Sequence, residues 1–379
     1  MSKLKIIDLF SGIGGLSLGF KDSGYSISAH LDIEKNCIDT LKLNFNDKGL
    51  FIHEDITNID SYISKLKDHV DGNLDGIVGG PPCQAYSLAG RINKKNKMDE
   101  DPRNFLFESF VKVLEILQPK FFIFENVVGM LSAKPFGVNV LDDISKSFES
   151  ANFEINNDFR SCIFDMSKYS IPQKRKRVII FGVNKNYYNN SRDLVKKFYE
   201  LMNKKASINQ QTVRDAIYDL PKILPVKNKD SIDIKNPYIV TEKFEEHLPR
   251  FHNQRDIKIF KILTEDIQNG TLKYASSNEL KKLYKKFTNK DSKVHKYHVL
   301  RWDKPSNTIP AHLYKDGLRH IHPDPEQCRS ITVREAARLM TFPDNFKFSG
   351  SRGDKYKGLG NAVPPKFAEV IAKTIKEVL

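Results

Sequence analysis

The first 183 residues alternate short apolar runs with amphipathic segments, and this alternation restricts the fold more than any other feature. The apolar runs have the length of strands, and segments with helical spacing follow several of them. Strands that alternate with helices need crossover connections, which produce a mostly parallel sheet covered on both faces. We therefore predict an α/β fold with a doubly wound, mostly parallel sheet. Strands are expected at Leu4–Phe10, Tyr25–Ile33, Gly76–Val78, Phe121–Phe124 and Val178–Val183, and helices at 34–45 and Asn104–Leu117.

The alternation is lost between Asn184 and about Pro310. This stretch contains 26 Lys and Arg against 15 Asp and Glu, so it carries most of the net charge of +14. A basic surface is typical of a protein with a polyanionic partner, although it can also serve solubility alone. We predict a smaller, irregular domain inserted into the first, followed by a helix at 332–340.

The composition describes a globular protein of 379 residues with 40% hydrophobic residues and no apolar run long enough to span a bilayer. The start of the chain enters a strand-like segment without the features of a signal sequence. The four cysteines are scattered, so neither a disulfide framework nor a metal site is predicted. We expect a cytoplasmic protein with reduced thiols.

One cysteine follows a strand on a stiff loop, Gly79-Gly80-Pro81-Pro82-Cys83. Glycine and proline restrict this loop and let its backbone approach a flat ligand closely. A cysteine presented in this way is placed to act as a nucleophile, but a lone free cysteine is more often a small buried hydrophobe.

A glycine-rich turn, Ser11-Gly12-Ile13-Gly14-Gly15, joins the first strand to a helix. Its glycines allow the backbone to approach a ligand, and Asp32 at the end of the next strand is placed to accept hydrogen bonds from ribose hydroxyls. The spacing is not the strict dinucleotide pattern. It leaves open a nucleotide-like cofactor, a nicotinamide dehydrogenase and a purely structural turn.

Two further polar motifs lie next to buried strands. Glu125 and Asn126 close the strand at 121–124, where a carboxylate could act as an acid or simply cap the following segment. The basic run 172–177 precedes the strand at 178–183. Its arginines could bind a phosphate or a base carbonyl, or lie on a solvated surface.

Together these segments resemble the DNA (cytosine-5)-methyltransferase family, in particular its prokaryotic restriction–modification members. The resemblance spans nearly the whole chain outside the basic stretch, and it rests on six motifs in the order of the family. They are Phe10–Gly15, Pro82-Cys83-Gln84, Glu125-Asn126-Val127, Gln173-x-Arg175-x-Arg177, Arg334-Glu335-Ala336-Ala337-Arg338-Leu339 and Gly360-Asn361-Ala362-Val363-Pro364-Pro365. Gly358 and Asp32 depart from it, standing where many relatives have Gln and Glu.

The resemblance implies a sequence-specific enzyme that transfers a methyl group from S-adenosylmethionine to carbon 5 of cytosine in double-stranded DNA. It assigns 1–183 and 350–379 to the catalytic, cofactor-binding domain, and 184–349 to a target-recognition domain with its hinge. Cys83 would be the nucleophile at carbon 6, Glu125 would hold the base edge, and Arg177 would meet the carbonyl oxygen with support from Arg175. The implied cofactor pocket comprises Phe10, Ser11, Gly12, Gly14, Asp32, Ile33, Asp55, Ile56, Pro82, Leu106, Asn361 and Ala362, and the implied DNA contacts are Gln84, Ser87 and Asn126.

Three other functions use parts of the same pattern. A tRNA cytosine-5 methyltransferase would share the pocket, a non-catalytic DNA-binding regulator would lack the chemistry, and a nicotinamide dehydrogenase would have no use for the cysteine loop. We expect a monomer that binds duplex DNA and no membrane. The sequence leaves open the recognised site and a cognate restriction endonuclease that acts separately.

Overall fold

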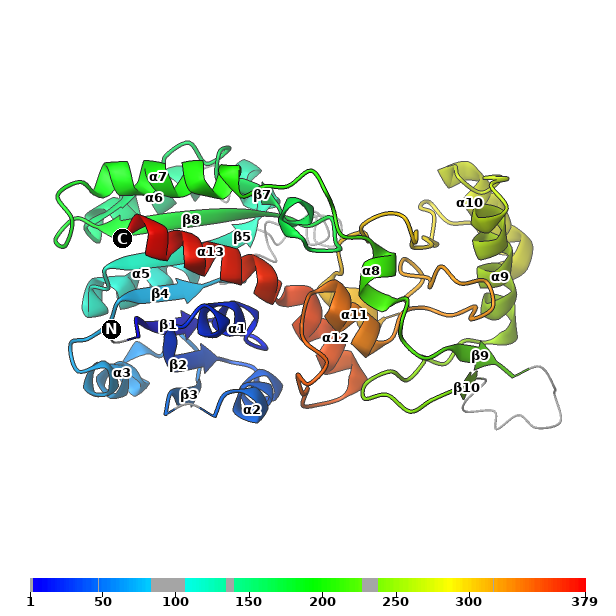
Figure 1. Cartoon of the computed structure of the whole chain (residues 1–379), viewed down its shortest axis with the longest axis horizontal. Helices are drawn as coiled ribbons and strands as arrows, with labels where there is room; N and C mark the ends of the chain where they lie inside the picture. The colour runs from blue at the N-terminus through cyan, green and yellow to red at the C-terminus, as the bar shows by residue number, and fades with distance from the viewer. Residues whose placement is uncertain (1–2, 47, 83–105, 134–139, 227–237, 316) are drawn as a thin grey trace.

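The computed structural model describes residues 3–46, 48–82, 106–133, 140–226, 238–315 and 317–379. Two lobes lie side by side in Figure 1, one built on the large sheet and the other on the later helices. Both chain ends lie in the first lobe, because α13 (Pro365–Val378) returns from the second lobe across the sheet. Within the described ranges, no helix combines the length and apolar character that crossing a membrane requires.

A mixed sheet of eight described strands forms the first lobe, in the order β3-β2-β1-β4-β5-β8-β6, with β7 paired to β8. The first five strands in this order are parallel, whereas β8 runs antiparallel to β5, β6 and β7. The prediction of a mostly parallel α/β sheet is confirmed. The strands are β1 (Lys5–Leu9), β2 (Ser26–Asp32), β3 (Leu50–His53), β4 (Gly76–Gly79), β5 (Phe121–Val127), β6 (Phe153–Ile155), β7 (Ile163–Asp165) and β8 (Lys176–Asn184).

Helices cover both faces of this sheet, which explains why β4 and most of β1, β5 and β8 are buried along their length. On the front face in Figure 1, α13 packs against α1 and α7, while α5 and α6 lie behind. The first-lobe helices are α1 (Gly15–Asp22), α2 (Lys35–Asn44), α3 (Ile63–Val70), α5 (Leu106–Leu117), α6 (Val140–Ser150) and α7 (Ser191–Lys204), with 3₁₀ turns η1 (Ile59–Ser61), η3 (Val128–Ser132) and η5 (Met166–Tyr169).

The second lobe contains two further hydrophobic cores. One gathers α8 (Val213–Ile217), η7 (Ala311–Tyr314), α11 (Val333–Leu339) and α12 (Arg352–Asn361). The other packs α9 and α10 against a small antiparallel hairpin. Its elements are β9 (Ile223–Pro225), β10 (Tyr238–Val240), α9 (Gln254–Gln268) and α10 (Ser277–Thr288).

One helix lies on the other side of the expected boundary. We assigned residues from 184 onward to the inserted domain because the alternation of strands and helices is lost there and the composition changes, but α7 packs into the core of the large sheet through Val195, Phe198 and Met202. The basic residues lie on the exposed face of α7. The composition of this segment therefore reflects its surface and does not indicate which core its apolar face joins.

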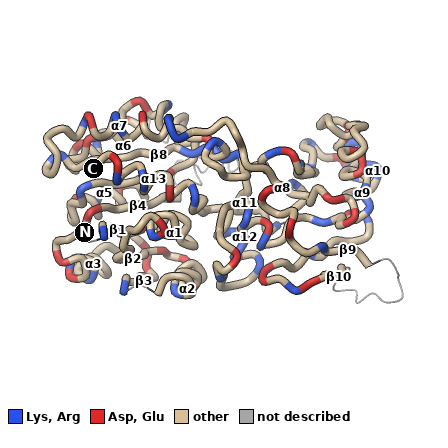
Figure 2. The backbone as a smooth tube through the Cα atoms, viewed as in Figure 1, with Lys and Arg blue, Asp and Glu red and all other residues tan. Residues whose placement is uncertain are grey.

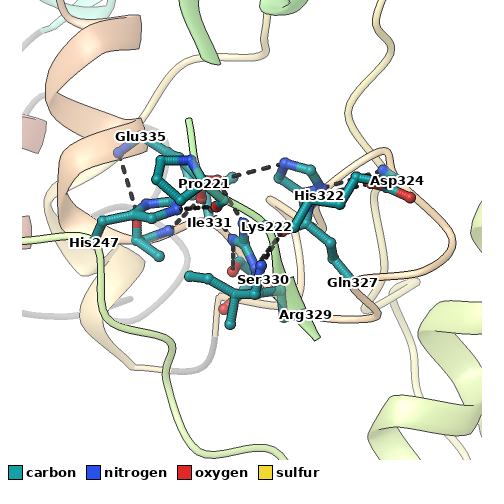
Figure 3. Close-up of polar contacts among 12 residues, drawn as sticks. Pro221, Lys222, His247, His322, Asp324, Gln327, Arg329, Ser330, Ile331 and Glu335 are labelled. Atoms are coloured by element: carbon teal, nitrogen blue, oxygen red, sulfur yellow. Dashed lines mark hydrogen bonds and ion pairs between the residues drawn. The ribbon is translucent and has the colours of Figure 1, made fainter. Parts of the chain in front are cut away.

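A buried ionic network holds α11 in the second lobe (Figure 3). The carboxylate of Glu335 accepts two hydrogen bonds from Arg329, at 2.6 and 2.7 Å, and one from the amide of Thr332 at 2.7 Å. Arg329 also donates to Gln327, whose Oε1 accepts the amide of the first residue of β9. Glu335 and Arg329 are each 1% exposed, so loss of either partner would leave an uncompensated buried charge. The network therefore ties α11 to the hairpin core.

The protein is predicted to lose stability as the pH falls below about 6.5. Burial lowers the pKa of several histidines to about 3, whereas an unfolded histidine titrates near 6.5. Between pH 6.5 and 3, these histidines are therefore protonated in the unfolded chain and neutral in the folded chain. Each such histidine can remove up to about 1.4 kcal/mol of unfolding free energy per pH unit. They are His30, His252, His320 and His322.

Thermal unfolding between pH 7 and 5.5 checks this expectation. His320 is 1% exposed, so His320→Leu should weaken the pH dependence while an apolar side chain fills the same site. The control is His69→Leu at an exposed position of α3. Two results would contradict the assignment of this pH dependence to buried histidines. The unfolding midpoint of the wild type could be independent of pH, or its pH dependence could be the same in the His320→Leu and His69→Leu variants.

Candidate active site

The loop after β1 bends tightly at the edge where ligands bind in sheets of this kind. Phe10, Gly12 and Gly14 have positive φ angles of 56, 53 and 86°. A Cβ on Gly14 would lie 2.6 Å from Leu41, whereas a Cβ on Gly12 would meet no atom within 4 Å. The backbone at Gly12 therefore borders open space, which is available to a ligand.

Asp32 joins this loop to the end of β2. Its carboxylate accepts the amide of Gly12 at 2.7 Å and the amide of Glu34 at 2.8 Å. Burial raises the pKa of Asp32, although these two hydrogen bonds act in the opposite direction. The structure thus brings Asp32 and the glycine loop together.

The other predicted pocket residues lie in different environments. Asp55 is half-buried, and one of its carboxylate oxygens accepts the amide and hydroxyl of Thr57 at 2.9 and 2.8 Å. Ile56 is buried in the first core, while Ile33 is 59% exposed. The remaining members range from buried to exposed: Ser11 and Ala362 are buried, Pro82 and Leu106 half-buried, and Asn361 exposed.

The start of the cysteine loop lies against Glu125. The order of strands reverses at β1 and β4, and β4 pairs in parallel with β5 so that Gly79 is opposite Phe124. A Cβ on Gly80 would lie 2.7 Å from Oε2 of Glu125. This approach brings the loop to the carboxylate. Cys83, Gln84 and Ser87 lie outside the described residues.

Glu125 and Arg177 form an ion pair across neighbouring strands. Because β5 and β8 are antiparallel with Val127 opposite Arg177, Glu125 is the diagonal neighbour of Arg177 on the same face. Nε of Arg177 lies 2.9 Å from Oε1 of Glu125, and the side chains are 14% and 11% exposed. A carboxylate and a guanidinium are thereby held together where solvent is largely excluded, which strengthens their electrostatic action on a ligand.

Arg175 has a different role from Arg177. Its side chain is 1% exposed, and its guanidinium donates to three backbone carbonyls, those of Ile309 at 3.2 Å, Gly360 at 3.0 Å and Ala362 at 3.0 Å. These contacts join β8 to the second lobe. The guanidinium of Arg175 is therefore occupied by the backbone, and the predicted support of the site by Arg175 stays a prediction.

A cavity of about 730 Å³ opens beside Arg177. Gln210 on one wall donates to Ser167 at 3.1 Å, and Thr308 on another donates to the carbonyl of Lys174 at 2.6 Å. The volume is typical of a small-molecule site. The lining residues are Val127, Val128, Gly129, Asp165, Ser167, Lys174, Lys176, Arg177, Gln210 and Thr308.

Two residues of the motifs act within the protein. Asn126 is 5% exposed, and its Oδ1 accepts the amide of Val127 at 2.7 Å, so it shapes the end of β5. Gln173 is buried and receives the amide of Ile309 at 3.1 Å. Sequence analysis gave Gln173 no role, although its place in the arginine motif was a signal. No local signal places Gln210 or Thr308 at the cavity, because they come from distant segments.

Comparison with known proteins identifies the family. The family model for C-5 cytosine-specific DNA methylases matches residues 4–377. The chain belongs to this family. Among its relatives, the Type II methyltransferase M.Bpa9945I of Bacillus paralicheniformis is 34% identical over 99% of both chains. The Type II methyltransferase M.DdeI of Desulfomicrobium norvegicum is 31% identical over 98% of this chain and 88% of its own.

Solved structures give the same result for the fold. A prophage-encoded candidate DNA modification methyltransferase (E. coli) has a TM-score of 0.67 and 27% identity, with 99% of both chains covered. Dnmt2 of S. pombe has a TM-score of 0.59 at 16% identity, with 100% of this chain and 98% of that chain covered, and supports the fold alone. The protein is therefore a DNA cytosine methyltransferase that uses S-adenosylmethionine.

The residues present fit this methyl donor. The open space over Gly12 accommodates a ligand against the loop backbone, and the carboxylate of Asp32 is the chemical group that ribose hydroxyls require. Asp32 keeps the acid at this position although many relatives have Glu. The shorter side chain still reaches the loop, as its 2.7 Å contact with Gly12 shows.

The two arginines should separate stability from catalysis. Arg175→Lys is expected to lower the unfolding free energy by about 3 kcal/mol, because one ammonium cannot replace a planar guanidinium on three carbonyls. Arg177→Lys should cost under about 1 kcal/mol of stability but about 10²-fold in kcat/KM for methyl transfer. Urea unfolding and methyl-transfer kinetics measure both. An Arg175→Lys protein with unchanged stability and lost activity would instead place Arg175 on the substrate.

Proposed function

We propose that this chain is the modification enzyme of a Type II restriction–modification system, which methylates a specific cytosine in duplex DNA so that a separate nuclease cannot cut there. Support comes from the two relatives named Type II methyltransferases, whose similarity extends over at least 98% of this chain. A monomer in the cytoplasm fits this role, because the enzyme must reach chromosomal DNA one site at a time.

One observation carries the proposed assignment of the active site. The Glu125–Arg177 ion pair, at 2.9 Å, lies next to Gly80, three residues before Cys83. A carboxylate and a guanidinium are the groups needed to hold the polar edge of cytosine. The loop that carries the only cysteine of the motifs begins beside this ion pair, at Gly80. The start of the cysteine loop follows β4, and Glu125 and Arg177 lie in β5 and β8.

In the proposed mechanism these residues make carbon 5 of cytosine nucleophilic. The thiolate of Cys83 adds to carbon 6, which produces an enamine whose carbon 5 is electron-rich. One oxygen of Glu125 accepts a hydrogen bond from the exocyclic amine, and the other shares a proton with ring nitrogen 3. Arg177 donates to the carbonyl oxygen as negative charge develops. S-adenosylmethionine supplies the methyl group as an electrophile. A base then removes the proton from carbon 5, and the Cys83 sulfur leaves carbon 6.

The target base must leave the duplex to reach these groups. Flipping costs a few kcal/mol, which contacts to the opened DNA have to offset. We assign Gln84 and Ser87 to this role. The cavity beside Arg177 offers Lys174 and Lys176, both exposed, as neighbours for the DNA backbone. Asn126 then acts by shaping the strand end, since it is buried.

The cofactor pocket is proposed from the same motifs. Phe10 would lie against the adenine, Asp32 would bind the ribose, and Asp55 would approach the adenine amine through the carboxylate oxygen that Thr57 leaves free. The loop backbone, the exposed Ile33 and the proline before Cys83 would surround the rest. The other proposed members are Ser11, Gly12, Gly14, Ile56, Pro82, Leu106, Asn361 and Ala362.

Replacing the nucleophile tests the chemistry directly. Cys83→Ser should bind DNA and S-adenosylmethionine with wild-type affinity and lose methyl transfer by at least about 10³-fold, because a serine hydroxyl is a far weaker nucleophile than a thiolate. Transfer of labelled methyl groups to duplex DNA and to tRNA measures the rates. Cys328→Ser is the matched control. Undiminished turnover in Cys83→Ser would reject the nucleophile, and transfer to tRNA alone would favour the RNA enzyme.

Lysines of α10 should contribute to the salt dependence of DNA binding. Figure 2 shows basic residues along α9 and α10 with acidic residues between them. Lys282 and Lys285 pair with Glu279 and Asp291 at 2.7 and 3.1 Å. Two other lysines of this helix, at 281 and 286, have no ion pair among the described residues, so they are the better candidates for phosphates.

The test compares two double variants. Lys281→Gln with Lys286→Gln should reduce the slope of log affinity against log salt by about 0.9 for each phosphate that the variant no longer neutralises. Lys65→Gln with Lys67→Gln on α3, in the other lobe, should leave the slope unchanged. Equal slopes for the wild type and the α10 variant would remove this helix from the DNA interface.

A further inference from the structure

Ile13 belongs to a different core from the residues on either side of it. Leu9 and Leu16, in β1 and α1, are buried in the core of the large sheet. Ile13 is 3% exposed and is buried in the core of the second lobe, with Ile309, Leu313 and other residues there. The glycine loop thus inserts one side chain into the other lobe.

The backbone of the same loop faces the proposed cofactor site. The amide of Gly12 donates to Asp32 at 2.7 Å, and the space over Gly12 is open. Gly12, whose backbone faces the proposed cofactor site, is therefore adjacent in the chain to Ile13, whose side chain packs in the second lobe. A shift of the loop cannot occur without moving Ile13, because packed cores transmit displacement.

Gly358 shows how closely Ile13 is held. A Cβ at position 358 of α12 would lie 2.6 Å from Cγ2 of Ile13, a distance at which one of the two must move. This contact explains why glycine stands where many relatives have Gln.

The second core connects in turn to the catalytic strand. Ile309, a member of that core, donates its amide to Gln173 and accepts a hydrogen bond from Arg175. Two residues further on, Arg177 pairs with Glu125. Contacts of the described residues therefore run without a break from the cofactor loop, through Ile13 and the second core, to the ion pair.

We propose that Ile13 is a positioning residue that couples occupancy of the cofactor site to DNA binding. The proposal rests on the function proposed above. A bound cofactor would hold the loop and, through Ile13, the second lobe in its DNA-binding arrangement. By thermodynamic reciprocity, each ligand would tighten the binding of the other by the same factor, typically between about 5-fold and 150-fold.

The experiment measures that factor with S-adenosylhomocysteine, the demethylated product. Its dissociation constant is determined by calorimetry for the free enzyme and for the enzyme bound to a duplex that bisulfite sequencing shows to be methylated. The wild type should bind it at least about 5-fold more tightly with DNA. In Ile13→Ala the ratio should fall to near 1.

Two variants distinguish coupling from general destabilisation. Ile13→Val keeps Cγ2, the atom nearest Gly358, and should keep the ratio. Leu16→Ala removes a comparable side chain from the first core and should also keep it. Gly358→Ala displaces Ile13 from the opposite side, so it should lower the ratio even if Ile13→Ala fails to fold.

The outcomes separate this inference from the proposed function. Three results would overturn the coupling in an enzyme that still transfers methyl groups. The ratio of dissociation constants could be near 1 in the wild type, it could stay at the wild-type value in both Ile13→Ala and Gly358→Ala, or it could fall equally in Leu16→Ala. Failure of the wild type to bind S-adenosylhomocysteine at all, or to methylate DNA, would instead reject the proposed function.

Discussion

The antiparallel pairing of β5 with β8 determines the geometry of the proposed active site. This pairing brings Arg177 diagonally next to Glu125, and Arg175, which precedes β8, turns to the second lobe. One short segment therefore performs two tasks. Arg177 supplies positive charge to the site, and Arg175 fixes that segment to the second lobe through three carbonyls.

The two lobes are joined through buried contacts as well as through the chain. Ile13 enters the second core from the cofactor loop, and Arg175 binds Gly360 and Ala362 from the start of the catalytic strand. In the second lobe itself, the Arg329–Glu335 network holds α11 to the hairpin core. Each link buries a group that would be costly to leave without its partner, which makes the relative position of the lobes part of the active site.

The sequence predicted the parts of the structure that depend on local pattern. Four of the five parallel strands and the residues of the motifs follow from apolar runs and turn chemistry, as at Asp32 and Glu125, whereas β3 was not predicted. The strands at 153–155 and 163–165 are too short to show a period, and they were missed. The roles of Arg175, Ile13 and Gln210 could not be read from spacing, because each depends on contacts with segments far away in the chain.

In the proposed mechanism, the loop after β4 brings Cys83 to a base held by Glu125 and Arg177. This arrangement can be tested by mass spectrometry of the complex with a duplex that carries 5-fluorocytosine at the methylated position. Fluorine at carbon 5 cannot be removed as the proton is, so the adduct persists. We expect one covalent adduct, located on Cys83. An adduct on Cys37, Cys162 or Cys328, or methyl transfer to normal DNA with no adduct on the fluorinated duplex, would contradict it.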